Sequence, residues 1–189
     1  MPHPVPAGMP PVHAWGVYAD PLRAAVSAWK DAGRRDLEGV LVPLLALSID
    51  AALTGVGWDD GVVLVVPAPS SRRAVRERGD TPMTGLCDAA ATQLLGRPGP
   101  TLRVAPALRH VRKVEDQSGL GTVERRGNLA GALSVIPLWQ RVIRDRRCLL
   151  VDDVVTTGAT FAEAARALRA AGAATVVGAS LAATQRTRG

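Results

Sequence analysis

Residues 148–160 combine groups that can hold an anion with groups that can hold hydroxyls. The segment reads CLLVDDVVTTGAT, in which an apolar run is followed by two adjacent carboxylates, Asp152 and Asp153, and then by small residues. The stretch from Phe161 to Ala171 is rich in alanine, leucine, arginine and glutamate, which favour helix. The segment therefore predicts a buried strand, an acidic pair, a hydroxyl-rich turn and a helix, in that order.

The turn before this helix has the composition of a phosphate-binding site. The first N–H groups of a helix lack intrahelical partners, and the helix dipole adds partial positive charge there. Threonine and glycine let the backbone close around an anion while hydroxyls donate further hydrogen bonds. The turn consists of Thr156, Thr157, Gly158, Ala159 and Thr160.

The two carboxylates favour a different part of a ligand. They repel a phosphate, but they suit neutral hydroxyls or a hydrated Mg²⁺ ion, which prefers oxygen ligands and keeps several waters. A phosphorylated ribose offers a phosphate at one end and hydroxyls in the middle. The segment is not a Walker loop, because no Gly-Lys-Ser/Thr follows, and it lacks the three spaced glycines of a dinucleotide fingerprint.

Composition narrows the class of protein. The chain has 189 residues, 47% of them hydrophobic, which is enough for one domain with a core. Its net charge of +6 suits a polyphosphate or nucleic-acid partner. Only Lys30 and Lys113 are lysines, so the arginine excess is equally consistent with the base composition of a genome. The cysteines, Cys87 and Cys148, form no CxxC pair, and the three histidines show no metal-ligand spacing.

Alternating apolar and helical segments predict an α/β domain with a mostly parallel sheet and right-handed connections. The proline-rich residues 1–12 are interpreted as a disordered lead-in to one domain over residues 13–189. Asp20 is the expected N-cap of the first helix, and Pro43 is expected to kink or divide the second. Helices are predicted over 20–32, 36–53, 84–95, 137–144 and 161–171, and strands over 13–18, 61–66, 101–108, 128–136, 148–151 and 175–183.

A second loop is expected at the same edge of the sheet. The apolar strand 61–66 ends in a segment of prolines, serines and arginines, and ligands of open parallel sheets lie beyond the carboxyl ends of the strands. The arginines offer charge for a second phosphate group, although a solvated basic turn is the alternative interpretation. The loop residues are Pro69, Ser70, Ser71, Arg72 and Arg73.

The stretch from Arg109 to Arg126 is polar and charged with little periodicity. A segment of this length without regular structure is unusual in a compact domain unless it acts as a lid. Such a lid closes over a reactive intermediate and brings cationic groups to a departing pyrophosphate. A disordered connector, or a charged hairpin without a ligand, is the other interpretation.

No targeting or membrane segment is expected. The N-terminus has no basic segment followed by an apolar core. The longest apolar stretch, Val40 to Ala52, is interrupted by Pro43 and Asp50 and is too short to span a bilayer. The sequence therefore predicts a cytoplasmic protein without membrane insertion.

Several segments together resemble a known family. The 148–160 segment is similar to the 5-phosphoribosyl 1-pyrophosphate (PRPP) motif of type I phosphoribosyltransferases. GVVLVVPAPSSRRAVRERG, VRKVEDQSGLGTVERRGNLAGAL and the early YADPLRAAVSAWKDAGRRDL resemble landmarks of the competence protein ComF family, a branch of these enzymes. The resemblance covers roughly Val17 to Ala183. It implies a type I phosphoribosyltransferase fold, with a mostly parallel twisted sheet flanked by helices and a small N-terminal hood.

The resemblance also implies roles for residues. Asp152 and Asp153 would hold the ribose 2′- and 3′-hydroxyls as the catalytic pair and contact Mg²⁺, if at all, through water. Thr156 to Thr160 would bind the 5′-phosphate, and Pro69 to Arg73 would form the pyrophosphate loop. A mobile loop would include Arg112, Lys113, Gln117, Arg125 and Arg126.

By the same resemblance, the chain transfers a phosphoribosyl group from PRPP to a nitrogen acceptor, such as a nucleobase, with release of Mg-pyrophosphate. The alternative is a non-catalytic PRPP or nucleotide sensor, or an accessory protein of DNA uptake that contacts DNA or the competence machinery. A homodimer is left open. The chain departs from the family in lacking a four-cysteine zinc finger, and in reading Arg78, Gly79, Asp80, Thr81, Pro82 where the family usually reads Arg-Gly-Phe-Asn-Gln.

Overall fold

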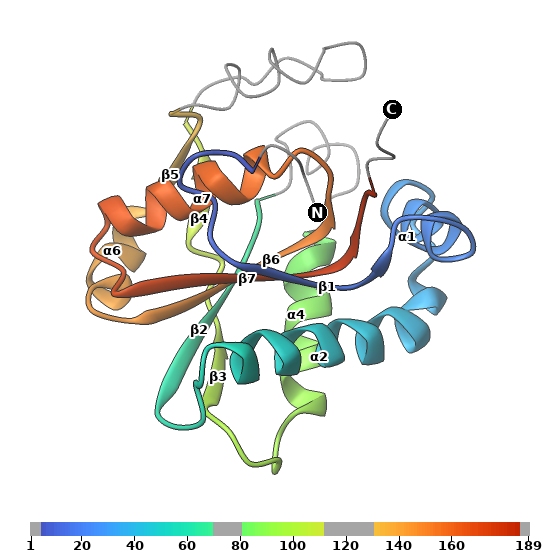
Figure 1. The fold of residues 1–189 in the computed structure, drawn as a ribbon, viewed down its shortest axis with the longest axis horizontal. Helices are drawn as coiled ribbons and strands as arrows, with labels where there is room; N and C mark the ends of the chain where they lie inside the picture. Colours follow the sequence, from blue (N-terminus) through green and yellow to red (C-terminus); the bar gives the residue numbers. More distant parts are fainter. Residues whose placement is uncertain (1–4, 70–80, 112–130, 186–189) are drawn as a thin grey trace.

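A five-stranded, wholly parallel sheet forms the centre of the molecule (Figure 1). The computed structural model describes residues 5–69, 81–111 and 131–185. The strands run in the order β1-β7-β6-β2-β3, so β6, which carries the acidic pair, lies in the middle. Their bounds are β1 (Val12–Val17), β2 (Val62–Pro67), β3 (Thr101–Val104), β6 (Arg147–Val155) and β7 (Thr175–Ala183).

The inner strands are buried on both faces, as their unbroken apolar sequences predicted. On β2, Val63 and Val65 belong to one core cluster, whereas Leu64 and Val66 belong to another on the opposite face. The same alternation occurs on β6 between Leu149 and its neighbour Leu150, both fully buried. The predicted α/β fold with a parallel sheet flanked by helices is confirmed.

Helices cover both faces of this sheet (Figure 1). One face is covered by α2 (Glu38–Gly55) and α4 (Pro82–Gln93), and α1 (Leu22–Asp31) packs into the same core cluster. The other face is covered by α7 (Ala159–Ala170), with α6 (Pro137–Ile143) beside it. A single 3₁₀ turn, η1 (Arg35–Leu37), connects α1 to α2.

The predicted strand over 101–108 is wrong in its extent. After β3, Ala105 donates a backbone hydrogen bond to Val65 at 2.8 Å, and the chain then turns into β4 (Leu108–His110). Strand β4 pairs antiparallel with β5 (Leu133–Val135), which is the returning strand in shortened form. This hairpin base flanks residues 112–130, which lie outside the described residues.

The prediction of a disordered lead-in over residues 1–12 is wrong for the described part, which starts at residue 5. Pro6 and Pro10 are buried, and Arg169 of α7 donates a hydrogen bond to the Gly8 carbonyl at 2.6 Å. The N–H of Gly178 donates to the Pro11 carbonyl at 2.8 Å. The apolar face of the segment and its carbonyl partners explain why it packs instead of remaining free.

Two expectations for the helices also need correction. Asp20 does not cap α1 with its side chain; it pairs with Arg23, whose Nη2 lies 2.6 Å from the carboxylate. Pro43 lies inside α2 without dividing it. Pro43 is the sixth residue of α2, so its missing N–H removes the bond that would otherwise run to the carbonyl of Gly39.

Helix α2 lies in a stretch that meets the length and composition of a membrane span. The stretch Arg35–Gly55 is long and apolar enough to cross a membrane by length and composition alone, so the expectation that it is too short was wrong. In the structure Leu41, Leu45 and Ile49 are fully buried, and the helix contacts β1, β7 and α4. These contacts are those of a core helix in an α/β domain.

Candidate functional site

The acidic pair and the end of β2 lie side by side at one edge of the sheet. Pro67 is the register partner of Val151, and the N–H of Ala68 donates to the Val151 carbonyl at 2.7 Å. The chain therefore leaves β2 beside Asp152, as the expected location of the second loop requires. Pro69 is half-buried there, whereas Ser70, Ser71, Arg72 and Arg73 lie outside the described residues.

The turn from Thr156 to Gly158 leads directly into the first residue of α7, Ala159. Gly158 adopts a left-handed conformation with φ of 73°, which a residue with a Cβ adopts only at a cost of roughly 1 kcal/mol or more. Its carbonyl accepts the N–H of Ala162 at 2.9 Å, and the Thr157 hydroxyl oxygen accepts the N–H of Ala159 at 3.4 Å. The glycine thus lets the strand turn sharply, so that the N-terminus of α7 lies next to the acidic pair.

The two carboxylates belong to β6 itself, which continues beyond them to Val155. Asp153 is buried and Asp152 is half-buried. One oxygen of Asp152 accepts the N–H of Asp153 at 2.9 Å, and one oxygen of Asp153 accepts the N–H of Val154 at 2.9 Å. These bonds hold both side chains against their own backbone near the carboxyl end of β6.

A cation from the N-terminal part of the chain completes this group. The ammonium of Lys30, in the last turn of α1, contacts the other carboxylate oxygen of Asp153. The two residues lie 123 positions apart in the sequence. Helix α1, in the predicted N-terminal hood, therefore contributes a charged side chain directly to the site.

The surroundings of Asp152 and Lys30 shift the pKa values of these two side chains. Burial, together with the adjacent charge of Asp153, raises the pKa of Asp152 to about 8. Burial acts to lower the pKa of Lys30, but the negative charges of Asp153 and Asp152 outweigh it, so that its pKa lies above its ordinary value. Lys30 is therefore charged at neutral pH, while Asp152 resists ionisation until a ligand or cation favours its charged form.

A second contact ties α7 to the β4–β5 hairpin. The buried carboxylate of Glu163 accepts the Leu133 N–H at 2.9 Å, and Arg166 donates to the Leu133 carbonyl at 2.9 Å. Arg166 and Glu163 also pair with each other at 2.8 Å. On the other strand of the hairpin, a ring nitrogen of His110 lies 3.2 Å from the Pro69 carbonyl. The hairpin base is thus fixed between α7 and the end of β2.

The hairpin leads into the segment predicted to be a mobile loop. Its candidate residues Arg112, Lys113, Gln117, Arg125 and Arg126 lie outside the described residues. The base of this loop, at β4 and β5, lies near the start of α7. Glu163, four residues after the first residue of α7, accepts the N–H of Leu133 in β5.

The residues that the structure describes do not form a metal site by themselves. Within the described ranges, no group of three or more His, Cys, Asp or Glu side chains lies close enough to hold a metal ion. Asp153 already uses one oxygen for an ammonium and the other for an N–H. A Mg²⁺ ion here would be held by phosphate oxygens of a ligand and by water, with Asp152 as the carboxylate able to accept a metal-bound water.

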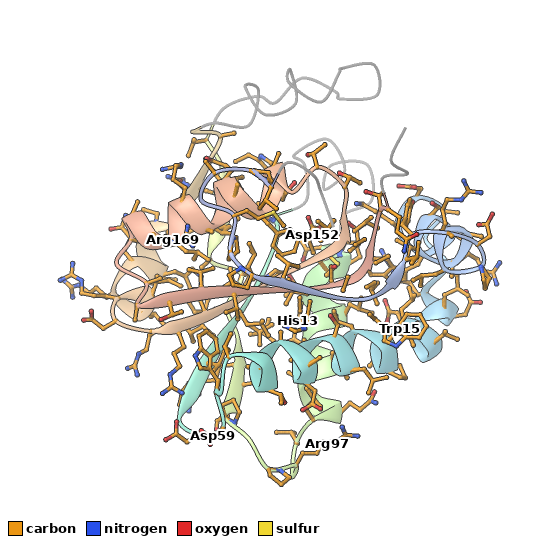
Figure 2. All side chains as sticks on the ribbon, viewed as in Figure 1. His13, Trp15, Asp59, Arg97, Asp152 and Arg169 are labelled. Carbon is orange, nitrogen blue, oxygen red and sulfur yellow. The ribbon has the colours of Figure 1, made fainter. Side chains whose placement is uncertain are left out.

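A separate depression of about 340 Å³ lies at the opposite edge of the sheet. Trp58, Leu94 and Leu102 form part of its apolar lining, and Asp59 and Arg97 contribute charge. Figure 2 shows Asp59 and Arg97 on the far side of the sheet from Asp152. Ligands of parallel sheets bind at the carboxyl ends of strands, so the acidic pair remains the better candidate.

Sequence reasoning missed Lys30 and the Glu163–Arg166 contact. Nothing local marks Lys30, because its partner is in another element far along the chain. A signal did exist in composition, since Lys30 is one of only two lysines in a chain with 23 lysines and arginines. Glu163 stands among alanines on the face of α7 that turns to the core, where an unpaired carboxylate would be costly.

Comparisons with known proteins point to one family. A model of the phosphoribosyl transferase domain matches residues 89–189. DNA utilization protein YhgH of Escherichia coli O157:H7 is 32% identical over 161 residues, which are 84% of this chain and 66% of that protein. YhgH of Shigella flexneri is 32% identical, and that of Escherichia coli O6:H1 is 31% identical, over the same lengths. The chain thus spans about two thirds of the length of these curated relatives.

Proposed function

This chain belongs to the phosphoribosyl transferase domain family and is homologous to the DNA utilization protein YhgH of the ComF branch, and from that premise we propose that it binds PRPP and transfers its phosphoribosyl group to a nitrogen acceptor. The observation that carries the proposal is the placement of Asp152 and Asp153 directly before a glycine-hinged turn at the N-terminus of α7. One half of this site suits a phosphate, and the other half suits sugar hydroxyls.

Each part of the site has a separate task in this reaction. The turn from Thr156 to Thr160 binds the 5′-phosphate with backbone N–H groups and hydroxyls, and the acidic pair fixes the ribose. The bond from C1′ to the pyrophosphate oxygen breaks, and the bond from C1′ to the acceptor nitrogen forms. Pyrophosphate leaves with the electron pair, and the acceptor nitrogen loses its proton.

Catalysis of this kind needs orientation and electrostatic stabilisation more than a protein nucleophile. The ribose ring gains positive charge in the transition state, and in this proposal Asp152, ionised once the ligand is bound, stabilises that charge. Magnesium is part of the substrate complex and neutralises charge on the leaving pyrophosphate. An arginine-rich loop after Pro69 would hold the same group, which is consistent with its departure point beside Asp152.

The proposal is tested by calorimetric titration with Mg-PRPP and by pyrophosphate release across a panel of nucleobases. We expect binding by the natural chain, and its loss in the double variant Asp152→Asn/Asp153→Asn. Asp59→Asn is the matched control, because Asp59 is an exposed carboxylate at the opposite edge of the sheet. Absence of heat with Mg-PRPP in the natural chain would contradict the proposal, and equal binding by the double variant would contradict the site.

The name of the relatives supports a second candidate, an accessory role with DNA. They are described as DNA utilization proteins, and this chain carries a net charge of +6. If such a role holds, DNA affinity should fall steeply and linearly on a logarithmic scale as salt concentration rises, because neutralised phosphates release counterions. Salt-dependent DNA binding together with no pyrophosphate release for any base would favour this role. DNA binding that is absent at low salt would exclude it.

A further inference from the structure

The ion pair between Lys30 and Asp153 connects the hood to the candidate ribose site. Asp153 is only 5% exposed, so its charge requires a partner in the folded protein. Its two oxygens are both engaged, one by the Lys30 ammonium and the other by the N–H of Val154 at 2.9 Å. Each oxygen keeps a further lone pair, but because the side chain is only 5% exposed, ligand hydroxyls and metal-bound water have little access to it.

Lys30 is held in place by the residues around it. Trp29, the preceding residue, is fully buried, and its indole N–H donates to Glu38 at 3.0 Å. The guanidinium of Arg35 lies 5.4 Å from the centre of the Trp29 ring and donates to the Trp29 carbonyl at 3.2 Å. These contacts fix the last turn of α1, so the ammonium is presented to Asp153 by a rigid element and not by a mobile one.

The choice of side chain at this position fits such a role. Elsewhere in the described structure the ion pairs use arginine, as in Arg23 with Asp20 and Arg34 with Asp36. An ammonium is a compact point charge that fits beside one carboxylate oxygen, whereas a guanidinium needs a wider, planar partner. The Lys30 side chain remains 45% exposed, so it reaches the carboxylate from the solvent side of the site.

Asp152 differs from its neighbour. It is half-buried, and it forms no ion pair of its own within the ranges that the structure describes. One of its oxygens accepts the Asp153 N–H, and the residue directly follows Val151, the register partner of Pro67 at the end of β2. The pair is thus chemically unequal, although its sequence is symmetric.

Resting on the function proposed above, we propose that Lys30 divides the work of the acidic pair, with Asp153 as a permanently neutralised support and Asp152 as the residue that receives the ribose hydroxyls. Lys30 acts through Asp153 and is a positioning residue. Its fixed positive charge replaces a divalent cation at the acidic pair. A ribose 5-phosphate group without pyrophosphate should therefore bind to this site in the absence of magnesium.

The experiment measures ribose 5-phosphate affinity by calorimetry in the presence of a chelator. We expect the natural chain to bind, Lys30→Met to bind at least about tenfold more weakly because a buried charge loses its partner, and Lys30→Arg to retain more affinity than Lys30→Met. Arg34→Met is the matched control, since it removes an exposed cation three residues beyond α1. Affinity for inorganic phosphate, which occupies the turn alone, should be equal in all four proteins.

A double variant keeps the proposal testable if Lys30→Met folds poorly. Asp153→Asn in the Lys30→Met background removes the unpaired charge and should return the ribose 5-phosphate affinity toward that of the natural chain. Failure of this recovery would mean that Asp153 contacts the ligand itself, and the division of roles would be wrong.

The possible failures can be told apart. Equal ribose 5-phosphate affinity in Lys30→Met and the natural chain would overturn the role of Lys30 alone, and so would binding by the natural chain only when magnesium is added. A natural chain that binds neither ribose 5-phosphate nor Mg-PRPP would overturn both this inference and the proposed function.

Discussion

Replacing Asp152 by asparagine is expected to abolish Mg-PRPP binding while making the ligand-free protein more stable at neutral pH. The carboxylate is held in a site where burial and the charge of Asp153 raise its pKa to about 8. The ionised form of Asp152 is therefore energetically unfavourable until a ligand is bound. Asparagine keeps the size of the side chain but removes that charge, so that the folded state gains stability and the ribose loses its acceptor.

The raised pKa of Asp152 determines how the stability of the natural chain changes with pH. The pKa of Asp152 is raised from 3.8 in its ordinary state to about 8 in the folded protein, so the folded state binds the proton more tightly than the unfolded state does. The stability contributed by the protonated group is fully present below about pH 4, and it is lost progressively as the pH rises to about 8. The difference between Asp152→Asn and the natural chain should therefore grow over this range.

Thermal unfolding at several pH values checks the effect on stability. At pH 8 we expect Asp152→Asn to be more stable by up to about 5 kcal/mol, because each tenfold difference in proton affinity between the folded and unfolded states corresponds to roughly 1.4 kcal/mol. The gain in Tm should be up to about 10–20 °C for a chain of this length. Asp59→Asn should show no such pH-dependent gain. A variant that loses stability at pH 8, or that still binds Mg-PRPP normally, would contradict the assigned environment of Asp152.

Substituting Gly178 by alanine is expected to destabilise the fold and to weaken phosphate binding together. A Cβ at this position on β7 would lie 2.6 Å from the ring of Phe161 and 2.8 Å from Val12. Phe161 is the third residue of α7 and is 1% exposed, so its ring has little room to move. The start of α7 would shift away from the sheet, and the phosphate turn before it would shift as well.

Chemical denaturation and calorimetry with inorganic phosphate measure the two effects. We expect Gly178→Ala to lose about 1–3 kcal/mol of unfolding free energy, in the range found for overpacked cores. Gly85→Ala is the matched control: Gly85 lies within α4, and a Cβ there meets nothing within 4 Å. It should gain up to about 1 kcal/mol from helix propensity. A destabilised Gly178→Ala variant that still binds phosphate normally would show that α7 does not need this close approach to position the turn.

Local sequence was enough to predict most elements of the fold. The unbroken apolar run within 61–66 predicted a buried parallel strand, because only a sheet covered on both faces accommodates it, and the apolar stretch 175–183 predicted a further strand. The order of strand, acidic pair, small residues and helix was likewise legible, since each part has its own composition. The limits of the prediction appear where tertiary contacts override local preference, as in the packed residues 5–11 and in the division of 101–108 into β3 and β4.

What the sequence by itself determined is the acidic pair and the turn of small residues that leads into α7, because both depend on neighbouring residues in one short segment. Only the tertiary structure decided how the two carboxylates differ. The ammonium that engages Asp153 comes from α1, and the contact between Glu163 and Leu133 joins α7 to a separate hairpin. Such pairings depend on the packing of elements far apart in the chain, and charge and burial act through space, so no local pattern could specify them.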